Sequence, residues 1–307
     1  GFLQDSLVLM LFCSDEVEFV ACVGHDVSSD PVAIARQTAE FALTKLSSPP
    51  KLCLTLPESL TTSGVLLLEG LSQGFGDDVP VIGGTSGDQR YFCKTAQFFQ
   101  SEVLHDALPI LLVSGNLLIG HSIANGWMPM GKRGTVTKVD GNILYEIDSR
   151  SPIEFCRDFG MERPTPEYRL AVFEPEAQRW YLRTANGEYD LKTGGMAFFA
   201  DIPLHAKVQL VKATRDGILQ SVQLSAQKAL DAYPGVQPSA ALFFSCANRR
   251  QVLGTRAKEE HQLAMSLLNS SLPACGFYTY GEIAPLTQNS KARFHNETFV
   301  TLFLGSQ

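Results

Sequence analysis

The chain has 307 residues, which is enough for two domains with separate hydrophobic cores. Hydrophobic residues make up 45% and charged residues 19%, the proportions of an ordinary soluble globular protein. The formal net charge is -7, and no basic run is longer than the pair Arg249 and Arg250, so a surface that binds nucleic acid is not expected.

Apolar runs and cysteines favour an intracellular protein. No run approaches the roughly 20 residues of a membrane-spanning helix, so membrane insertion is not predicted. Residues 7–13 (LVLMLFC) are too short for a signal peptide and lack its basic leader, and we expect them to form a strand. Seven cysteines without a CxxC pair argue against a disulfide framework or a structural zinc site, and the six histidines lack metal-binding spacing. We therefore expect a cytoplasmic protein without a metal site.

In the first half, helices connect short strands before hairpins take over. Asp30 and Pro31 are typical of a helix start, and apolar residues recur after them at helical spacing. Beyond Lys94, the turn at 114–116 predicts one hairpin, and Asp140-Gly141 predicts another. The strands expected here lie at 7–13, 18–23, 52–56, 80–82, 107–113, 117–124, 135–139 and 143–147, with a second helix at 63–73.

The second half begins with a capping box, Ser151 to Glu154, which predicts a helix that stops at Gly160. Residues 161–167 contain two prolines and are interpreted as a linker. The remaining expected elements are strands at 179–184, 207–213, 240–245 and 274–278, helices at 216–232 and 255–268, and a polar turn at 246–250.

The two halves share an order of elements. In each, a strand and a helix are followed by a strand, a polar turn, a second helix, a proline, a short strand and a glycine, so that Gly83 corresponds to Gly276. This order predicts two structurally related domains, 1–150 and 151–307, from an ancient duplication. Because each half mixes helix-linked strands with hairpins, the predicted fold class is α+β, with mixed sheets flanked by helices.

Candidate ligand-binding residues lie where predicted strands end, which is where a scaffold usually presents groups to a ligand. Gly83 and Gly84 allow backbone N–H groups to turn toward an anion, and the Thr85 and Ser86 hydroxyls add donors. A tight turn without a ligand is the equal alternative, and the missing GK[ST] excludes a phosphate loop. Arg249 could bind a ligand carboxylate through its planar guanidinium group, or it could hold loop carbonyls.

Five further candidates follow toward the end of the chain. Glu282 could accept an ammonium group or lock two loops together, and Tyr278 and Tyr280 could line a pocket or pack in the core. His295 could donate a hydrogen bond to a ligand or be satisfied by a carbonyl of the protein, and Asn296 is expected to cap or close the turn before the last strand. An amino acid would then place its carboxylate at Arg249 or the 84–86 amides and its ammonium group at Glu282, in a pocket between the halves.

Three motifs carry a resemblance: SCANRR (245–250), GFYTYGEIAP (276–285) and HNETFV (295–300). They resemble the C-terminal half of the FIST family (F-box and intracellular signal transduction). The turn at 83–87 and the Gly-Trp-x-Pro turn at 126–129 are similar to its N-terminal half. The resemblance implies a cytoplasmic, non-enzymatic sensory module for small ligands such as amino acids. It would signal in trans through a partner such as a histidine kinase or a cyclase.

Two alternatives remain open. Some members of the family bind haem and sense nitric oxide, which here would require an axial ligand such as His121 or His295. A thiol hydrolase is the second alternative, because Cys246 stands at a strand end where neighbouring arginines could lower its pKa.

Overall fold

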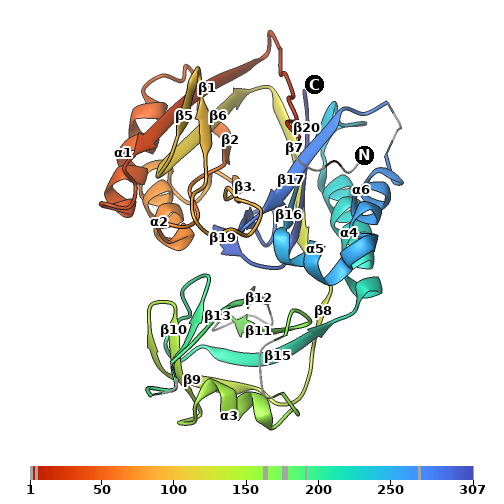
Figure 1. Ribbon diagram of the computed structural model, residues 1–307. Coiled ribbons are helices and arrows are strands. Elements are labelled where there is room, and N and C mark those ends of the chain that lie inside the picture. Colours follow the sequence, from red (N-terminus) through yellow and green to blue (C-terminus); the bar gives the residue numbers. More distant parts are fainter. Residues whose placement is uncertain are drawn as a thin grey trace.

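The computed structural model describes residues 3, 6–161, 165–174, 179–190, 192–268 and 271–306. Two sheets stacked face to face, with helices on both outer sides, form one body, and a third sheet forms a second body (Figure 1). Both stacked sheets are mixed, because each contains one parallel pair among antiparallel ones. The predicted α+β class with mixed sheets flanked by helices is confirmed.

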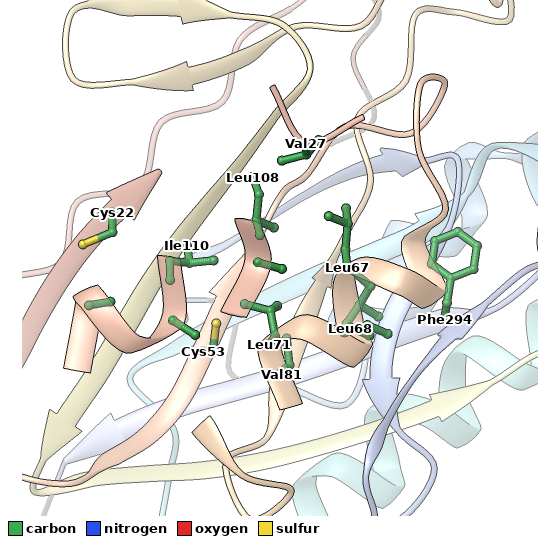
Figure 2. Packing of buried hydrophobic residues seen from close by; sticks show 14 of the residues in the cluster. Cys22, Val27, Cys53, Leu67, Leu68, Leu71, Val81, Leu108, Ile110 and Phe294 are labelled. Atoms are coloured by element: carbon green, nitrogen blue, oxygen red, sulfur yellow. The ribbon is translucent and has the colours of Figure 1, made fainter. Parts of the chain in front are cut away.

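The first sheet carries two helices on its outer face. Asp30 caps the first helix by accepting a hydrogen bond from Ala33 N at 3.0 Å, and Ser63 caps the second. Figure 2 shows Leu67, Leu71 and other apolar side chains packed between these helices and the sheet. The sheet order is β1 (Val17–His25), β6 (Ala107–Gly115), β2 (Pro50–Thr55), β3 (Val81–Gly84), β18 (Glu282–Pro285) and β19 (Ala292–His295), covered by α1 (Pro31–Leu43) and α2 (Gly64–Phe75).

The second sheet packs against the first through its inner face, where Leu242 and Leu302 meet Leu52 and Ile82. Figure 1 shows its helices on the opposite, outer side. The result is a helix–sheet–sheet–helix sandwich. The sheet order is β17 (Ala274–Thr279), β16 (Ala240–Cys246), β20 (Phe299–Ser306) and β7 (Leu117–Ala124), covered by α4 (Arg215–Ala232), α5 (Ala247–Leu253), the short helix η1 (Gly254–Arg256) and α6 (Lys258–Met265).

The stacked sheets repeat one topology. In the first, β2 pairs parallel with β3 and antiparallel with β6, which pairs antiparallel with β1. In the second, β16 has the same relations to β17, β20 and β7. The repeat therefore starts at β1 and again at β7. The division into domains at residue 150 stays a prediction, since each sheet contains strands from both sides of it.

The third sheet is inserted between β7 and α4, and we call it the inserted body. One face forms its own core with α3 (Pro152–Arg157), and the other face packs on α4 and α5 through residues such as Ala171 and Leu182. Its order is β12 (Trp180–Arg183), β11 (Tyr168–Phe173), β15 (Lys207–Ala213), β9 (Gly134–Asp140), β10 (Ile143–Ile147), β14 (Met196–Phe198) and β13 (Ala185–Tyr189), with β8 (Trp127–Pro129) beside β15. A separate pair joins β4 (Gln97–Phe99) and β5 (Glu102–Leu104).

Several local predictions are confirmed. The capping box of Ser151 and Glu154 forms with both hydrogen bonds, and the hairpin turn at Asp140-Gly141 joins β9 and β10. α3 ends at Arg157, just before Gly160, which has a φ of +76°. The expected linker at 161–167 includes residues 162–164, which lie outside the described residues. None of the described helices combines the length and the hydropathy needed to cross a lipid bilayer.

Three local predictions are wrong. Residues 7–13 form no strand, and Leu7 and Leu11 are 83% and 84% exposed. The 114–116 turn makes no hairpin, because β6 already pairs with β1 and β2 on both edges and β7 must cross to the second sheet. The expected polar turn at 246–250 is instead the end of β16 and the start of α5.

Candidate functional site

Besides the link from β6 to β7, the chain crosses twice between the stacked sheets, and both of these crossings contain motifs that carried the family resemblance. The first crossing links β17 to β18 through 279–282, and the second links β19 to β20 through 295–299. The strand ends after Ile82 and Ser245 meet at the first crossing. Thr85 N donates to Gly281 O at 2.8 Å, and Thr279 Oγ1 lies 3.2 Å from Ser245 O.

Glu282 connects the two crossings. Its Oε1 accepts a hydrogen bond from Thr279 Oγ1 at 2.6 Å, and its Oε2 accepts from Thr298 N at 3.0 Å and Thr298 Oγ1 at 2.8 Å. Complete burial and, to a smaller extent, the nearby Glu297 carboxylate raise the pKa of this carboxyl to about 8, against the lowering effect of the hydrogen bonds. The geometry favours the reading of Glu282 as a lock between two loops.

Arg249 lies fully buried in α5, and its guanidinium group bonds to other groups of the protein. Nε and Nη2 contact Glu260 Oε1 at 2.9 and 2.8 Å, while Nη1 donates to Asn125 O at 2.8 Å. Tyr278 Oη donates to the other oxygen of Glu260 at 2.6 Å. This arrangement favours the alternative in which Arg249 holds loop carbonyls, with Glu260 as its charge partner.

The glycine-rich turn has little donor capacity left for a ligand. Gly83 and Gly84 pair with β18, and Ser86 N donates to Pro57 O at 2.9 Å. Thr85 N already donates to Gly281 O. Tyr280 Oη donates to Asp88, and its ring stacks on Phe92 with centroids 5.1 Å apart.

The second crossing contains three consecutive residues with buried polar atoms that lack a partner among the described residues. These atoms are His295 Nδ1, Asn296 Oδ1 and Glu297 Oε2. Burial lowers the pKa of His295 to about 3, so the ring is neutral, and its Nε2 bonds Ala284 O at 2.9 Å. Asn296 was expected to close the turn, but the left-handed residue is Glu297, with a φ of +65°.

Glu297 extends the second crossing to the inserted body. Its Oε1 accepts hydrogen bonds from Arg169 of β11 and, at 2.9 Å, from Thr184 Oγ1. Sequence reasoning missed Glu297 as a site residue, although it stands within the HNET motif. No local motif marks Arg169 or Thr184, since only the packing of the two bodies brings them to Glu297.

Cys246 stands directly before α5 and is buried. Burial raises the pKa of its thiol, and the Glu282 and Glu297 carboxylates raise it further. The expectation that neighbouring arginines lower this pKa is wrong, because carboxylates are the charges that act on the thiol. The thiol is therefore protonated and a poor nucleophile.

A cavity of about 40 Å³ lies within the inserted body, and we call it the arginine cavity because Arg169 and Arg183 line it. Its remaining wall is largely apolar and comes from α3 and several strands. Arg183 is 4% exposed and donates to the carbonyls of Asp201 at 2.8 Å and Phe294 at 3.1 Å. Among the described residues it has no carboxylate partner, and burial lowers its pKa to about 10.

The chain matches the FIST N domain over residues 1–150 and the FIST C domain over residues 154–285. It therefore belongs to the FIST family, whose domains are sensory domains of signal transduction, and the resemblance noted in its motifs is confirmed.

Two relatives and one solved structure are similar to this chain. Uncharacterized protein MT0656 of Mycobacterium tuberculosis is 25% identical over 253 residues, which cover 76% of this chain and 63% of that protein. This chain thus spans less than two thirds of that relative. Uncharacterized protein MJ1623 of Methanocaldococcus jannaschii is 33% identical over 72 residues, covering 24% of this chain and 14% of that protein. A chorismatase crystal structure aligns with 95% of this chain and 76% of its own, at 8% identity and a TM-score of 0.37, too distant to transfer an activity.

Proposed function

We propose that this chain is a non-enzymatic sensory module that binds a small carboxylate-bearing metabolite, the class that includes amino acids, with Arg183 at the arginine cavity as the anchor for the carboxylate. The observation that carries the proposal is Arg183, a buried guanidinium that lines a cavity and has no carboxylate partner among the described residues. The guanidinium donates to carbonyls and lies over the Tyr181 ring at 4.4 Å, so its direct partners among the described residues are neutral groups. Burying a charge carries a desolvation cost, and a bound anion would offset part of that cost.

Arg169 connects the cavity to the second crossing. It lines the same cavity and pairs with Glu297 of the second crossing. The Arg169–Glu297 pair is neutral as a unit, so Arg183 is the source of net positive charge at the cavity. A ligand that repositioned Arg169 would act directly on the segment that joins the stacked sheets.

Family membership supports the signalling part of the proposal. In this role the protein works in the cytoplasm and communicates its ligand state in trans to a signalling protein, such as a histidine kinase or a cyclase. The protonated thiol of Cys246 supports a module without thiol catalysis.

The residues present do not fit haem. His121 lies on the same face of β7 as Ile119 and Ile123, which pack between the stacked sheets, and burial lowers its pKa to about 4. Neither His121 nor His295 lines the arginine cavity or the groove of about 160 Å³ beside Phe12 and Leu304. Pockets for drug-sized ligands measure roughly 300–1,000 Å³.

A ligand screen tests the proposed function. Thermal shift and calorimetry with amino acids, other small carboxylates and haem should find a carboxylate that stabilises the protein, because binding to the native state adds about 2.7 kcal/mol at a hundredfold excess over Kd. Arg183→Met should lose this binding. Arg179→Met is the matched control, since Arg179 is half exposed and lies just before the same strand. If no carboxylate binds, or if Arg183→Met binds as tightly as the unaltered protein, the proposal fails.

A further inference from the structure

An uncharged apolar segment, residues 7–13 (LVLMLFC), lies on the surface of the protein. Its exposure alternates along the chain. Met10 is half-buried, whereas the leucines on either side of it are largely exposed, Leu9 by 77% and Leu11 by 84%. Such alternation is typical of an extended chain that turns one face to the protein and the other to solvent. The solvent face of the apolar segment is therefore a row of leucines, which Leu7 completes.

Exposed apolar side chains of the protein are concentrated in this region. Of the 20 large hydrophobic side chains that are exposed among the described residues, six lie between residues 3 and 12, which makes this region a patch and not scattered exposure. The six are Leu3, Leu7, Val8, Leu9, Leu11 and Phe12. Monomeric soluble proteins rarely leave a large contiguous apolar patch open to water, and such a patch usually marks a contact surface.

The second sheet has an open edge beside the apolar segment. β17 pairs with β16, and no described strand pairs with its outer edge. In the repeated topology β3 is the counterpart of β17, because each is the parallel partner of its neighbour. The outer edge of β3 is extended by β18, where Gly84 pairs antiparallel with Glu282. In the described part of the chain, the second sheet thus lacks the strand that the first sheet has at the equivalent position.

This edge has none of the features that usually prevent pairing with another chain. Residues 274–277 (ACGF) contain no charged side chain and no proline, and Phe277 is 39% exposed. By contrast, β1 and β19, which end the first sheet, contain Glu18 and Arg293. Charges and prolines on an edge strand oppose the addition of a further strand. Residues 274–277 can therefore accept an added strand.

The apolar segment and the open edge belong to one surface. Met10 Sδ lies 4.0 Å from Cys275 Sγ of β17. A twofold-symmetric dimer requires such a self-complementary surface, on which a strand that can be donated lies next to an edge that can accept one. Neither 7–13 nor 274–277 contains a charged side chain, so two copies with a net charge of -7 each can meet here without like charges in contact.

We propose that the protein forms a twofold-symmetric dimer in which the apolar segment of each copy pairs with residues 274–277 of the other copy. The added strand extends the second sheet as β18 extends the first, and the partner copy covers the row of leucines. Because the exchange is reciprocal, both contacts count toward the roughly 1,200–2,000 Å² that a stable interface buries. No residue of 7–13 or 274–277 lines the arginine cavity, so the dimer does not depend on the proposed ligand site.

Sedimentation equilibrium of the full chain tests the dimer. Between about 1 and about 100 µM, the mass should rise to twice that of one chain. Leu9→Asp should weaken the dimer at least tenfold, because it buries a carboxylate in an apolar contact. Its melting temperature at low concentration should equal that of the unaltered protein, since Leu9 is 77% exposed within one chain. A protein that stays monomeric over the whole range, or a Leu9→Asp variant that dimerises as tightly, overturns the proposal.

Leu204→Asp is the matched control. Leu204 is 51% exposed and belongs to the inserted body, outside both proposed contact segments. This variant carries the same added charge and should dimerise like the unaltered protein. If it weakens the dimer as much as Leu9→Asp does, the apolar segment is not the contact and the proposal fails.

Hydrogen exchange identifies the edge that accepts the strand. In the dimer, outward-facing backbone N–H groups of residues 274–277 gain partners, so their exchange should slow about tenfold or more from low to high concentration. The amides of the apolar segment should slow with them. In Leu9→Asp, neither region should depend on concentration. A dimer in which residues 274–277 exchange at the same rate at both concentrations overturns the pairing with β17.

Discussion

Glu282 illustrates how a single buried acid can join distant segments. Its two oxygens accept hydrogen bonds from Thr279 on one crossing and Thr298 on the other, so it holds the crossings together without a cationic partner. The protonated form loses none of these contacts. The proton can be donated to Thr279 Oγ1, which in turn can donate to Ser245 O. A neutral side chain at this position is therefore compatible with the fold.

The stability of the protein should depend on pH through this residue. The pKa of Glu282 is about 8 when folded and near 4.5 when unfolded. Between these values the folded state holds a proton that the unfolded state has released, so the stabilising contribution is complete below pH 4.5 and is lost as the pH rises through 8. Glu282→Gln, which mimics the protonated form, should melt higher than the unaltered protein at pH 8, and the difference should shrink toward pH 5.

Glu58→Gln provides a control with the opposite sign. Glu58 is also buried, but hydrogen bonds from Thr95 and the Leu60 amide outweigh the effect of burial and lower its pKa. Its contribution to stability is present at neutral pH and lost on acidification. Melting curves from pH 4 to 8 measure both differences. A pH-independent difference for Glu282→Gln would contradict the raised pKa.

At the scale of elements, the two parallel strand pairs share a close backbone approach. Gly83 of β3 faces Thr55 of β2, and Gly276 of β17 faces Phe243 of β16 in the same register. A Cβ atom at either glycine would overlap the backbone carbonyl of its partner strand. This shared constraint explains the matching glycines in the sequence, because no side chain fits between the paired strands.

Alanine substitutions should show this equivalence. Gly83→Ala and Gly276→Ala should each destabilise the protein by about 3 kcal/mol or more, since a strand must move to relieve the overlap. Gly160→Ala is the control, because Gly160 has a positive φ and, among the described residues, no atoms near the position of the new Cβ. That change should cost only about 1 kcal/mol, from the strained backbone alone. Melting temperatures from calorimetry compare the three variants. A Gly276→Ala protein as stable as Gly160→Ala would refute the shared constraint.

At the scale of the whole molecule, the two halves of the chain complete each other's sheets. β18 and β19 extend the first sheet, while β7 lies at the edge of the second. The inner core also combines both halves, since Leu52 and Ile82 pack with Leu242 and Leu302. Each half alone would expose apolar faces and unpaired strand edges.

Separate expression of the halves measures this dependence. We expect the fragments 1–150 and 151–307 to lack cooperative unfolding transitions alone and to regain one when they are produced together. A fragment 1–150 that unfolds cooperatively by itself would show that the division at residue 150 marks independent folding units.

The sequence by itself determined the local structure, the fold class and the family. Helix caps at Asp30 and Ser151 and the turn at Asp140-Gly141 are read correctly, because hydrogen bonds and backbone preferences act over a few residues. Its motifs also marked the two crossings at 279–282 and 295–299, although not what those segments do.

Only the tertiary structure decided the partners of strands and of charges. Residues 7–13 have the composition of a strand but pair with no described strand, and β7 follows β6 in sequence yet pairs with β20. Arg249 and Arg183 are both buried arginines, but Glu260 neutralises the first, whereas the second faces a cavity with no carboxylate partner among the described residues. Such differences arise from contacts between residues far apart in the chain, which no short-range pattern encodes.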